Sequence, residues 1–182
     1  RRQQRSTLFP LHDALPIYEM NKGFYMASGQ VVGIVNSDDY YENDAIENIV
    51  AAMTDEKYQI LYGFLRCLDG DREIKVELYH HNNLVHKMIT HPTCFVTKPV
   101  YEDYGMYDTS YRSSADYEFM LRVYDRGGVS FIPVYKIISN LRYGGMSHSE
   151  IGYRETIKLQ LSRGTLKKGR YIQLLIRAYL HE

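Results

Sequence analysis

The sequence has only two cysteines, no long apolar run and no excess of either charge, and each of these shortages excludes a class of protein. Two thiols in 182 residues cannot form the disulfide framework of a small secreted domain, so we expect Cys67 and Cys94 to be buried cytosolic thiols. The longest apolar stretches, residues 31–35 and 171–180, are shorter than the roughly 20 residues of a membrane-spanning helix. With 45% hydrophobic and 24% charged residues, the composition excludes disordered and fibrous proteins.

The net charge of zero hides an uneven distribution of charge along the chain. Residues 18–153 carry 12 basic and 19 acidic side chains, whereas residues 154–182 carry 7 basic and 2 acidic ones. An acidic body argues against nucleic acid as a partner, because a phosphate backbone is bound by basic residues. The basic C-terminal segment leaves open an anionic partner such as a membrane surface.

The first seventeen residues differ from the rest of the chain. They lack the apolar core and cleavage site of a signal peptide, and they have neither helical nor strand periodicity. Residues 8–17 resemble a translated sequencing adapter. We therefore expect residues 1–17 to be a non-native leader, with native sequence beginning near Tyr18.

The remaining sequence alternates between strand and helix patterns. β-Branched and apolar residues at 30–35 predict a buried parallel strand, and residues 58–68 with 73–79 predict a hairpin. Further strands are expected at 91–96, at 129–132, where Pro133 ends the strand, and at 135–141. Helices are expected at 20–27, 43–53, 113–126 and 150–182. Ser113 or Ser114 is expected to cap the third helix, and the fourth is expected to break near Gly164 and Gly169. This order predicts an α/β domain with a mixed sheet.

A polar and acidic turn, Asn36-Ser37-Asp38-Asp39, follows the first predicted strand. Ligands of open α/β sheets bind outside the carboxyl ends of the strands. Adjacent carboxylates repel each other unless a cation or hydrogen bonds compensate, and oxygen ligands beside a phosphate-bearing substrate suit Mg²⁺ or Mn²⁺. On spacing alone, a turn that caps the next helix is the simpler interpretation.

Two other kinds of metal site are disfavoured by spacing. An EF-hand loop beginning at Asn36 would place Tyr40 at a ligand position and Tyr41 where glycine is needed. The histidines of the central region lack the spacing of a zinc site; they are His80, His81, His86 and His91.

Several short motifs occur in a specific order between residues 19 and 150. They are MNKG (20–23), ASG (27–29), VNSDDYY (35–41), HPTCFV (91–96), Gly105 with Tyr107-Asp108, ADYE (115–118) and RYGGMS (142–147). Each motif alone is weak. Their order and spacing resemble the central segment of family 2 glycosyltransferases of the GT-A fold, close to the bacterial enzymes that build cell-surface polysaccharides.

The resemblance implies a fold and a reaction. It implies a partial GT-A domain over residues 18–150, a mixed sheet flanked by helices without the family's first βαβ unit, followed by a basic helical tail over 151–182. The implied reaction moves a sugar from a nucleotide-diphosphate-sugar donor to a hydroxyl acceptor, either a glycan or a lipid-linked sugar. Metal-assisted displacement would invert the configuration of the sugar.

The resemblance also assigns the donor site. Asn36 stands where many relatives contact the ribose, and Asp38 stands at the metal position with Asp39 beside it. The implied cofactor is a divalent metal, Mn²⁺ or Mg²⁺, on the diphosphate. Asn36 departs from the strict DxD pattern, which leaves the division of roles between Asp38 and Asp39 open. Lys22 and Asn21 are expected near the donor.

Asp116 matches the catalytic carboxylate of the family, which implies that it is the general base for the acceptor hydroxyl. A carboxylate in the first turn of a helix also simply stabilises that helix. Contacts with the acceptor or the phosphates are expected from His91, Arg142 and Ser147, although a strand-end histidine and an exposed loop are often structural.

The tail leaves two interpretations open. One is a helix that packs its apolar stripe on the domain, and the other is a surface helix on anionic lipid. The resemblance implies a cytoplasmic protein, and the second interpretation adds peripheral contact with the inner face of the membrane.

Two other functions stay open. Another metal-dependent phosphate enzyme, a nucleotidyltransferase or a phosphatase, would also use an acidic strand end, although Asn36 replaces the nucleophilic Asp of an aspartyl-phosphate phosphatase. The third hypothesis is an inactive truncated fragment, in which Asp38 and Asp116 lie far apart.

Overall fold

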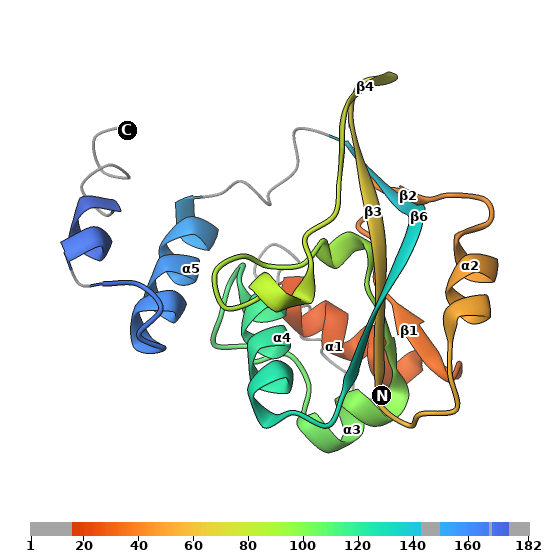
Figure 1. The fold of residues 1–182 in the computed structure, drawn as a ribbon, viewed down its shortest axis with the longest axis horizontal. Coiled ribbons are helices and arrows are strands. Elements are labelled where there is room, and N and C mark those ends of the chain that lie inside the picture. The colour runs from red at the N-terminus through yellow and green to blue at the C-terminus, as the bar shows by residue number, and fades with distance from the viewer. Residues whose placement is uncertain (1–15, 143–149, 168, 175–182) are drawn as a thin grey trace, which may run out of the picture.

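The computed structural model describes residues 16–142, 150–167 and 169–174, and it contains a six-stranded mixed sheet between layers of helices (Figure 1). The strands are β1 (Val31–Gly33), β2 (Tyr40–Tyr41), β3 (Gln59–Asp69), β4 (Arg72–Glu77), β5 (Phe95–Thr97) and β6 (Ser130–Arg142). The helices are α1 (Pro16–Met26), α2 (Ala45–Ala52), α3 (Lys98–Tyr104), α4 (Ala115–Arg126) and α5 (Glu150–Ser162), with 3-10 turns at His81–Asn83 and His91–Thr93. The expected α/β class is confirmed.

The sheet is built around β3, whose strand neighbours come from distant parts of the chain. The strand order is β1-β5-β3-β6-β2, and β4 pairs with β3 as the second arm of the predicted hairpin. β3 and β6 run parallel, whereas the other pairs are antiparallel. The expectation of a buried parallel strand at residues 30–35 is wrong, because β1 is a half-buried strand at the edge of the sheet and pairs antiparallel with β5.

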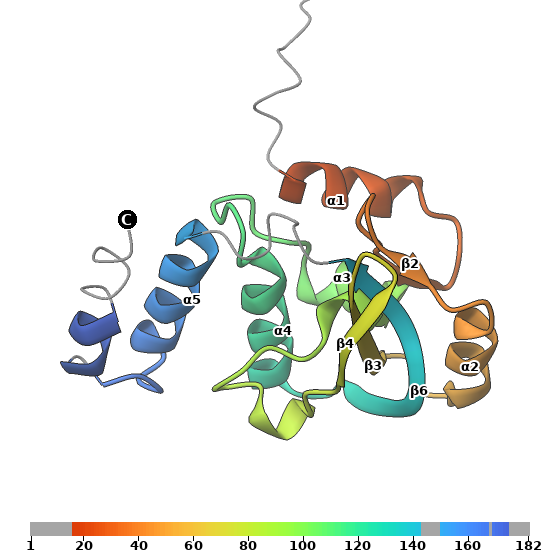
Figure 2. The ribbon, with the colours of Figure 1, turned by 90° about the horizontal axis from the view of Figure 1, so that it is seen from above.

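Alternation along β3 divides the core between the two faces of the sheet. Ile60 and Tyr62 belong to the larger cluster, which includes buried side chains of α1, α3 and α4, whereas Leu61 belongs to the smaller cluster with Ile49 of α2. Figure 2 shows α4 and α2 on opposite sides of the strands. The helices of the described residues are too short or too polar to cross a membrane.

Two element boundaries differ from the expected ones, and the packing of α5 supports one of the two interpretations of the tail. β6 continues through Pro133, because β2 pairs only with Ser139 and Asn140 and leaves that part of β6 without a neighbour on its second side. α1 begins at Pro16 and so includes the last two residues of the expected leader, and Ile17 is buried in the larger cluster. α5 buries Leu159 against that same cluster.

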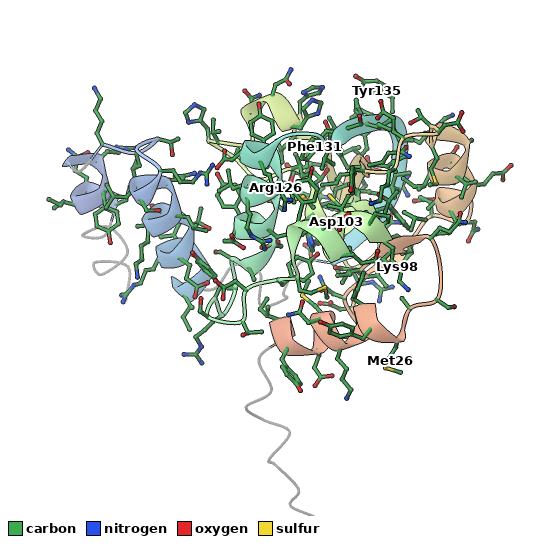
Figure 3. All side chains as sticks on the ribbon, turned by 90° about the horizontal axis from the view of Figure 1, so that it is seen from below. Met26, Lys98, Asp103, Arg126, Phe131 and Tyr135 are labelled. Atoms are coloured by element: carbon green, nitrogen blue, oxygen red, sulfur yellow. The ribbon has the colours of Figure 1, made fainter. Side chains whose placement is uncertain are left out.

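Ion pairs and hydrogen bonds join the elements at the amino end of β3. Lys57 and Tyr58 both donate hydrogen bonds to the Asp103 carboxylate, at 2.9 and 2.6 Å. Arg126 at the end of α4 donates to the Asp103 carbonyl at 2.6 Å, and Figure 3 labels both residues where α3 and α4 meet. The acidic turn before β2 and the end of β6 at Arg142 lie toward the opposite end of β3.

Gly63 lies in β3 where the pairing with β6 changes register. A Cβ atom there would clash with Ile138 and lie 2.8 and 2.9 Å from the carbonyl oxygens of Lys136 and Val134. The Gly63 N–H donates to Thr93 Oγ1 at 3.0 Å, and its carbonyl accepts from Thr90 Oγ1 at 2.9 Å. This glycine therefore lets β6 approach β3 and anchors the His91–Thr93 turn.

Gly63→Ala is expected to destabilise the fold by about 1–3 kcal/mol, because two backbone carbonyls and a core side chain must move. Gly23→Ala is the matched control, since an added Cβ in the exposed α1 meets no atom within 4 Å. Gly23→Ala is expected to raise the free energy of unfolding by roughly 0.5–1 kcal/mol, because alanine has a higher helix propensity than glycine. Urea unfolding of both variants measures the difference, and equal midpoints would contradict this account.

Candidate functional site

The acidic turn lies at the end of the sheet where several elements meet. β1 ends at Gly33, which pairs with Phe95 at the start of β5, so residues 91–94 enter β5 at that same end. β6 runs antiparallel to β2 and parallel to β3, and it ends at Arg142, next to the pair of Asn140 with Tyr40 at the start of β2. Residues 34–39 connect β1 at one edge of the sheet to β2 at the other.

The two aspartates of the turn have different surroundings. Asp39 Oδ2 accepts from the Asn36 side-chain amide at 2.9 Å, and Asp39 Oδ1 accepts from the Arg142 backbone N–H at 3.1 Å. The Asp39 carboxylate thus ties the turn to the end of β6. Asp38 is exposed, and the described part of the chain gives its carboxylate no hydrogen bond or ion pair. Asp38 is therefore the carboxylate available to an external ligand.

Arg142 places a positive charge beside this turn. Its guanidinium lies 5.4 Å from the centre of the Tyr40 ring. Arg142 and Tyr40 line a cavity of about 260 Å³ together with Arg66 and the β3–β4 turn. The Arg66 charge is balanced by Glu42 at 2.6 Å and Glu73 at 2.9 Å, whereas the described residues supply no carboxylate to the Arg142 side chain.

Asp116 is held at the start of α4, where its own Oδ1 accepts the Tyr117 N–H at 2.8 Å. Its Oδ2 lies 3.5 Å from His91 Nδ1, and the side chains of His91 and Asp116 are 15% and 27% exposed. On the other side of the imidazole ring, His91 Nε2 lies 3.3 Å from the Tyr107 hydroxyl. The structure thus brings together two of the predicted site residues, His91 and Asp116.

The remaining predicted residues lie in different places. Asn21 donates to the Tyr107 carbonyl at 2.8 Å and accepts the Tyr107 N–H at 3.1 Å, so both ends of its amide hold the Tyr107 backbone. Lys22 is exposed on α1 and lies 3.8 Å from Glu19. Ser147 lies outside the described residues.

Glu155 on α5 is a structural neighbour of Asp116 that the sequence patterns did not indicate. Its carboxylate accepts the backbone N–H groups of Arg112, Ser113 and Ser114 at 2.8–2.9 Å. The expected side-chain cap by a serine is absent at the described N-cap, Ser114, whose hydroxyl instead donates to the Gly152 carbonyl. No local sequence pattern indicates this contact, because Glu155 is distant in the chain from residues 112–114 and only the fold brings α5 to the start of α4.

Cys94 packs beside this group as an unreactive thiol. Burial raises its pKa well above the usual value, and the Asp116 charge raises the pKa further. Both cysteines are buried, as expected.

A divalent metal fits the turn only as a partly protein-bound ion. The described residues contain no cluster of three or more His, Cys, Asp or Glu side chains that could hold a metal. Mg²⁺ and Mn²⁺ are commonly bound by one or two carboxylates together with substrate phosphates. The exposed Asp38 carboxylate, with Asp39 beside it, offers that kind of donor set.

The sequence model described as Glycosyl transferase family 2 matches residues 16–132. No curated protein sequence matches the chain. One solved structure that resembles it is S. aureus TarS 1–349 in complex with UDP-GlcNAc, with 15% identity and a TM-score of 0.58 over 87% of this chain and 50% of that one. TarS 1–349 in complex with UDP is similar at 16% identity, with a TM-score of 0.59 over 90% of this chain and 50% of that one. TarS 1–349 alone is similar at 16% identity, with a TM-score of 0.60 over 89% of this chain and 49% of that one.

These likenesses establish the fold, which is of the GT-A type as expected. The chain spans about half the length of the TarS 1–349 structures that it matches.

Glu155→Ala is expected to destabilise the fold by about 2 kcal/mol, because three backbone N–H groups lose a charged acceptor. Glu102→Ala is the matched control, since Glu102 is an exposed helical glutamate with no contact in the described residues, and its loss should stay within about 0.5 kcal/mol. Thermal or urea unfolding measures both variants. Equal stability of the two would exclude this role for Glu155.

Proposed function

Because this chain belongs to glycosyl transferase family 2, we propose that it transfers a sugar from a nucleotide-diphosphate-sugar donor to a hydroxyl acceptor. The observation that carries the proposal is the arrangement of two carboxylates at one end of the sheet. Asp38 is exposed in the turn after β1. Asp116 of α4 lies beside His91, and His91 belongs to the turn that leads into β5, the neighbour of β1.

In this proposal the turn binds the donor. Asn36 contacts the ribose, and Asp38 holds a divalent metal, Mn²⁺ or Mg²⁺, with Asp39 fixing the turn behind it. When bound, the metal neutralises the charge of the diphosphate leaving group. Arg142 adds a positive charge for the phosphates, consistent with its lack of a carboxylate partner among the described residues, and Ser147 and Lys22 are further candidates for donor contacts.

Asp116 acts as the general base in this proposal. A sugar hydroxyl is a poor nucleophile until a base accepts its proton, and a carboxylate next to the acceptor supplies that base. Attack on the anomeric carbon from the side opposite the diphosphate inverts its configuration. Asn21 has a supporting role, because it fixes the backbone of Tyr107, whose hydroxyl faces His91.

We place the reaction in the cytoplasm, in the synthesis of bacterial cell-surface polysaccharide, with a glycan or a lipid-linked sugar as acceptor. The support is the resemblance of the HPTCFV, ADYE and RYGGMS motifs to that group of enzymes. Residues 18–150 form the catalytic part, and the basic segment 151–182 is a candidate for contact with the inner face of the membrane. UDP-GlcNAc is the first donor to test, because it is the ligand of a TarS structure.

Asp38→Asn is expected to weaken Mn²⁺-dependent binding of the donor at least about tenfold, because it removes the exposed carboxylate that the metal needs. Titration calorimetry with UDP-, GDP- and dTDP-sugars, with and without EDTA, measures the effect. Asp55→Asn is the matched control, since it makes the same charge change at an exposed site without a contact in the described residues. Equal binding by both variants would refute the assigned donor site.

Asp116→Asn is expected to lower the rate of transfer by about 10²–10⁴-fold while the donor still binds, because the amide cannot accept the hydroxyl proton. The measurement is the release of nucleoside diphosphate in the presence of acceptor, alongside donor binding by calorimetry. Transfer at an unchanged rate would remove Asp116 from the mechanism.

A further inference from the structure

A line of polar side chains leads from the core to Asp116. The Tyr101 and Tyr107 hydroxyls lie 3.0 Å apart, and the Tyr107 hydroxyl lies 3.3 Å from His91 Nε2. The other ring nitrogen, Nδ1, lies 3.5 Å from Asp116 Oδ2. Both nitrogens of the imidazole therefore face protein groups.

Each member of this line is fixed in place by its own contacts. The backbone of Tyr107 is held on both sides by the Asn21 amide, and its ring packs edge-on against Phe119 with centroids 5.1 Å apart. The backbone of His91 is held in its turn, where its carbonyl accepts the Cys94 N–H at 2.8 Å. The hydroxyls of Thr90 and Thr93 attach that turn to Gly63 of β3.

One direction of hydrogen bonding runs through the whole line, with each hydroxyl donating toward Asp116. Burial raises the pKa of both Tyr101 and Tyr107 well above the usual value, so both hydroxyls keep their protons and can donate, Tyr101 to Tyr107 and Tyr107 to Nε2. When Tyr107 donates to Nε2, the neutral imidazole carries its proton on Nδ1, which is the nitrogen that faces Asp116.

We propose that His91 is the positioning residue for Asp116, holding its Oδ2 through Nδ1–H while Tyr107 fixes the tautomer of the ring. The inference rests on the proposed role of Asp116 as the base. The Tyr117 N–H holds the other carboxylate oxygen, so both oxygens are oriented and each keeps a lone pair for the acceptor. The 3.5 Å separation shortens when substrates bind, as contacts in active sites often do.

His91 is not the base in this scheme. Its side chain is the less exposed of the pair, 15% against 27%, and neither of its ring nitrogens is directed away from the protein. The proton of the acceptor goes to Asp116, and His91 keeps its own proton throughout.

The test compares two amides that replace different ring nitrogens. His91→Asn keeps a donor near the Nδ1 position, facing Asp116, whereas His91→Gln keeps one near the Nε2 position, facing Tyr107. We expect kcat to fall at least about tenfold in His91→Gln and to stay within about threefold in His91→Asn, with KM for the donor unchanged in both. His86→Asn is the control, because His86 makes its hydrogen bonds among the described residues through its backbone N–H and carbonyl.

An equal loss in the two amide variants, or a change confined to KM, would overturn the inference. In an Asp116→Asn background, His91→Gln is expected to cause no further loss, since the carboxylate that it positions is gone. A full additional loss there would assign His91 an independent role.

A second readout is independent of turnover. Nitrogen-15 NMR of the His91 ring is expected to show the Nδ1–H tautomer in the neutral imidazole, and Asp116→Ala or Tyr107→Phe should shift it toward Nε2–H. An Nε2–H tautomer that neither variant changes would overturn the inference. Absence of transfer with every donor, together with the expected tautomer, would instead count against the proposed function alone.

Discussion

The attachment of the His91–Thr93 turn to Gly63 is the contact on which the site depends. Two threonine hydroxyls satisfy the N–H and the carbonyl of a glycine in the central strand, at the point where β3 changes register with β6. The turn is therefore fixed to the most buried strand of the sheet, and His91 takes its position from it. Asp116 meets His91 from α4, whose start is held in turn by Glu155 of α5.

The carboxylates near this end of the sheet divide into two groups. Asp39 and Glu155 accept backbone N–H groups and hold local structure, which is a common and stabilising use of a buried or half-buried carboxylate. Asp38 and Asp116 keep accepting capacity for a ligand. The structural carboxylates are compensated by hydrogen bonds, so their charges do not need a cation.

Local patterns in the sequence predict the elements well and the contacts between them poorly. The hairpin of β3 and β4, the start of α4 and the acidic turn all follow from turn residues and periodicity. The prediction that β1 is a parallel strand was wrong, because the direction of pairing is set by strands distant in the chain. α3 was missed because Pro99 suggests a break, although proline is tolerated in the first turn of a helix. The roles of Asn21 and Glu155 could not be predicted, because their partners lie 86 and about 42 residues away.

The stereochemistry of transfer tests the central claim most directly. A donor with an α-linked sugar, such as UDP-GlcNAc, is incubated with the protein and a hydroxyl acceptor, and proton NMR records the configuration of the new glycosidic bond. Direct displacement with Asp116 as the base predicts a β-linked product. A product that retains the α configuration would contradict the account, because in-line displacement with Asp116 as the base inverts the anomeric carbon.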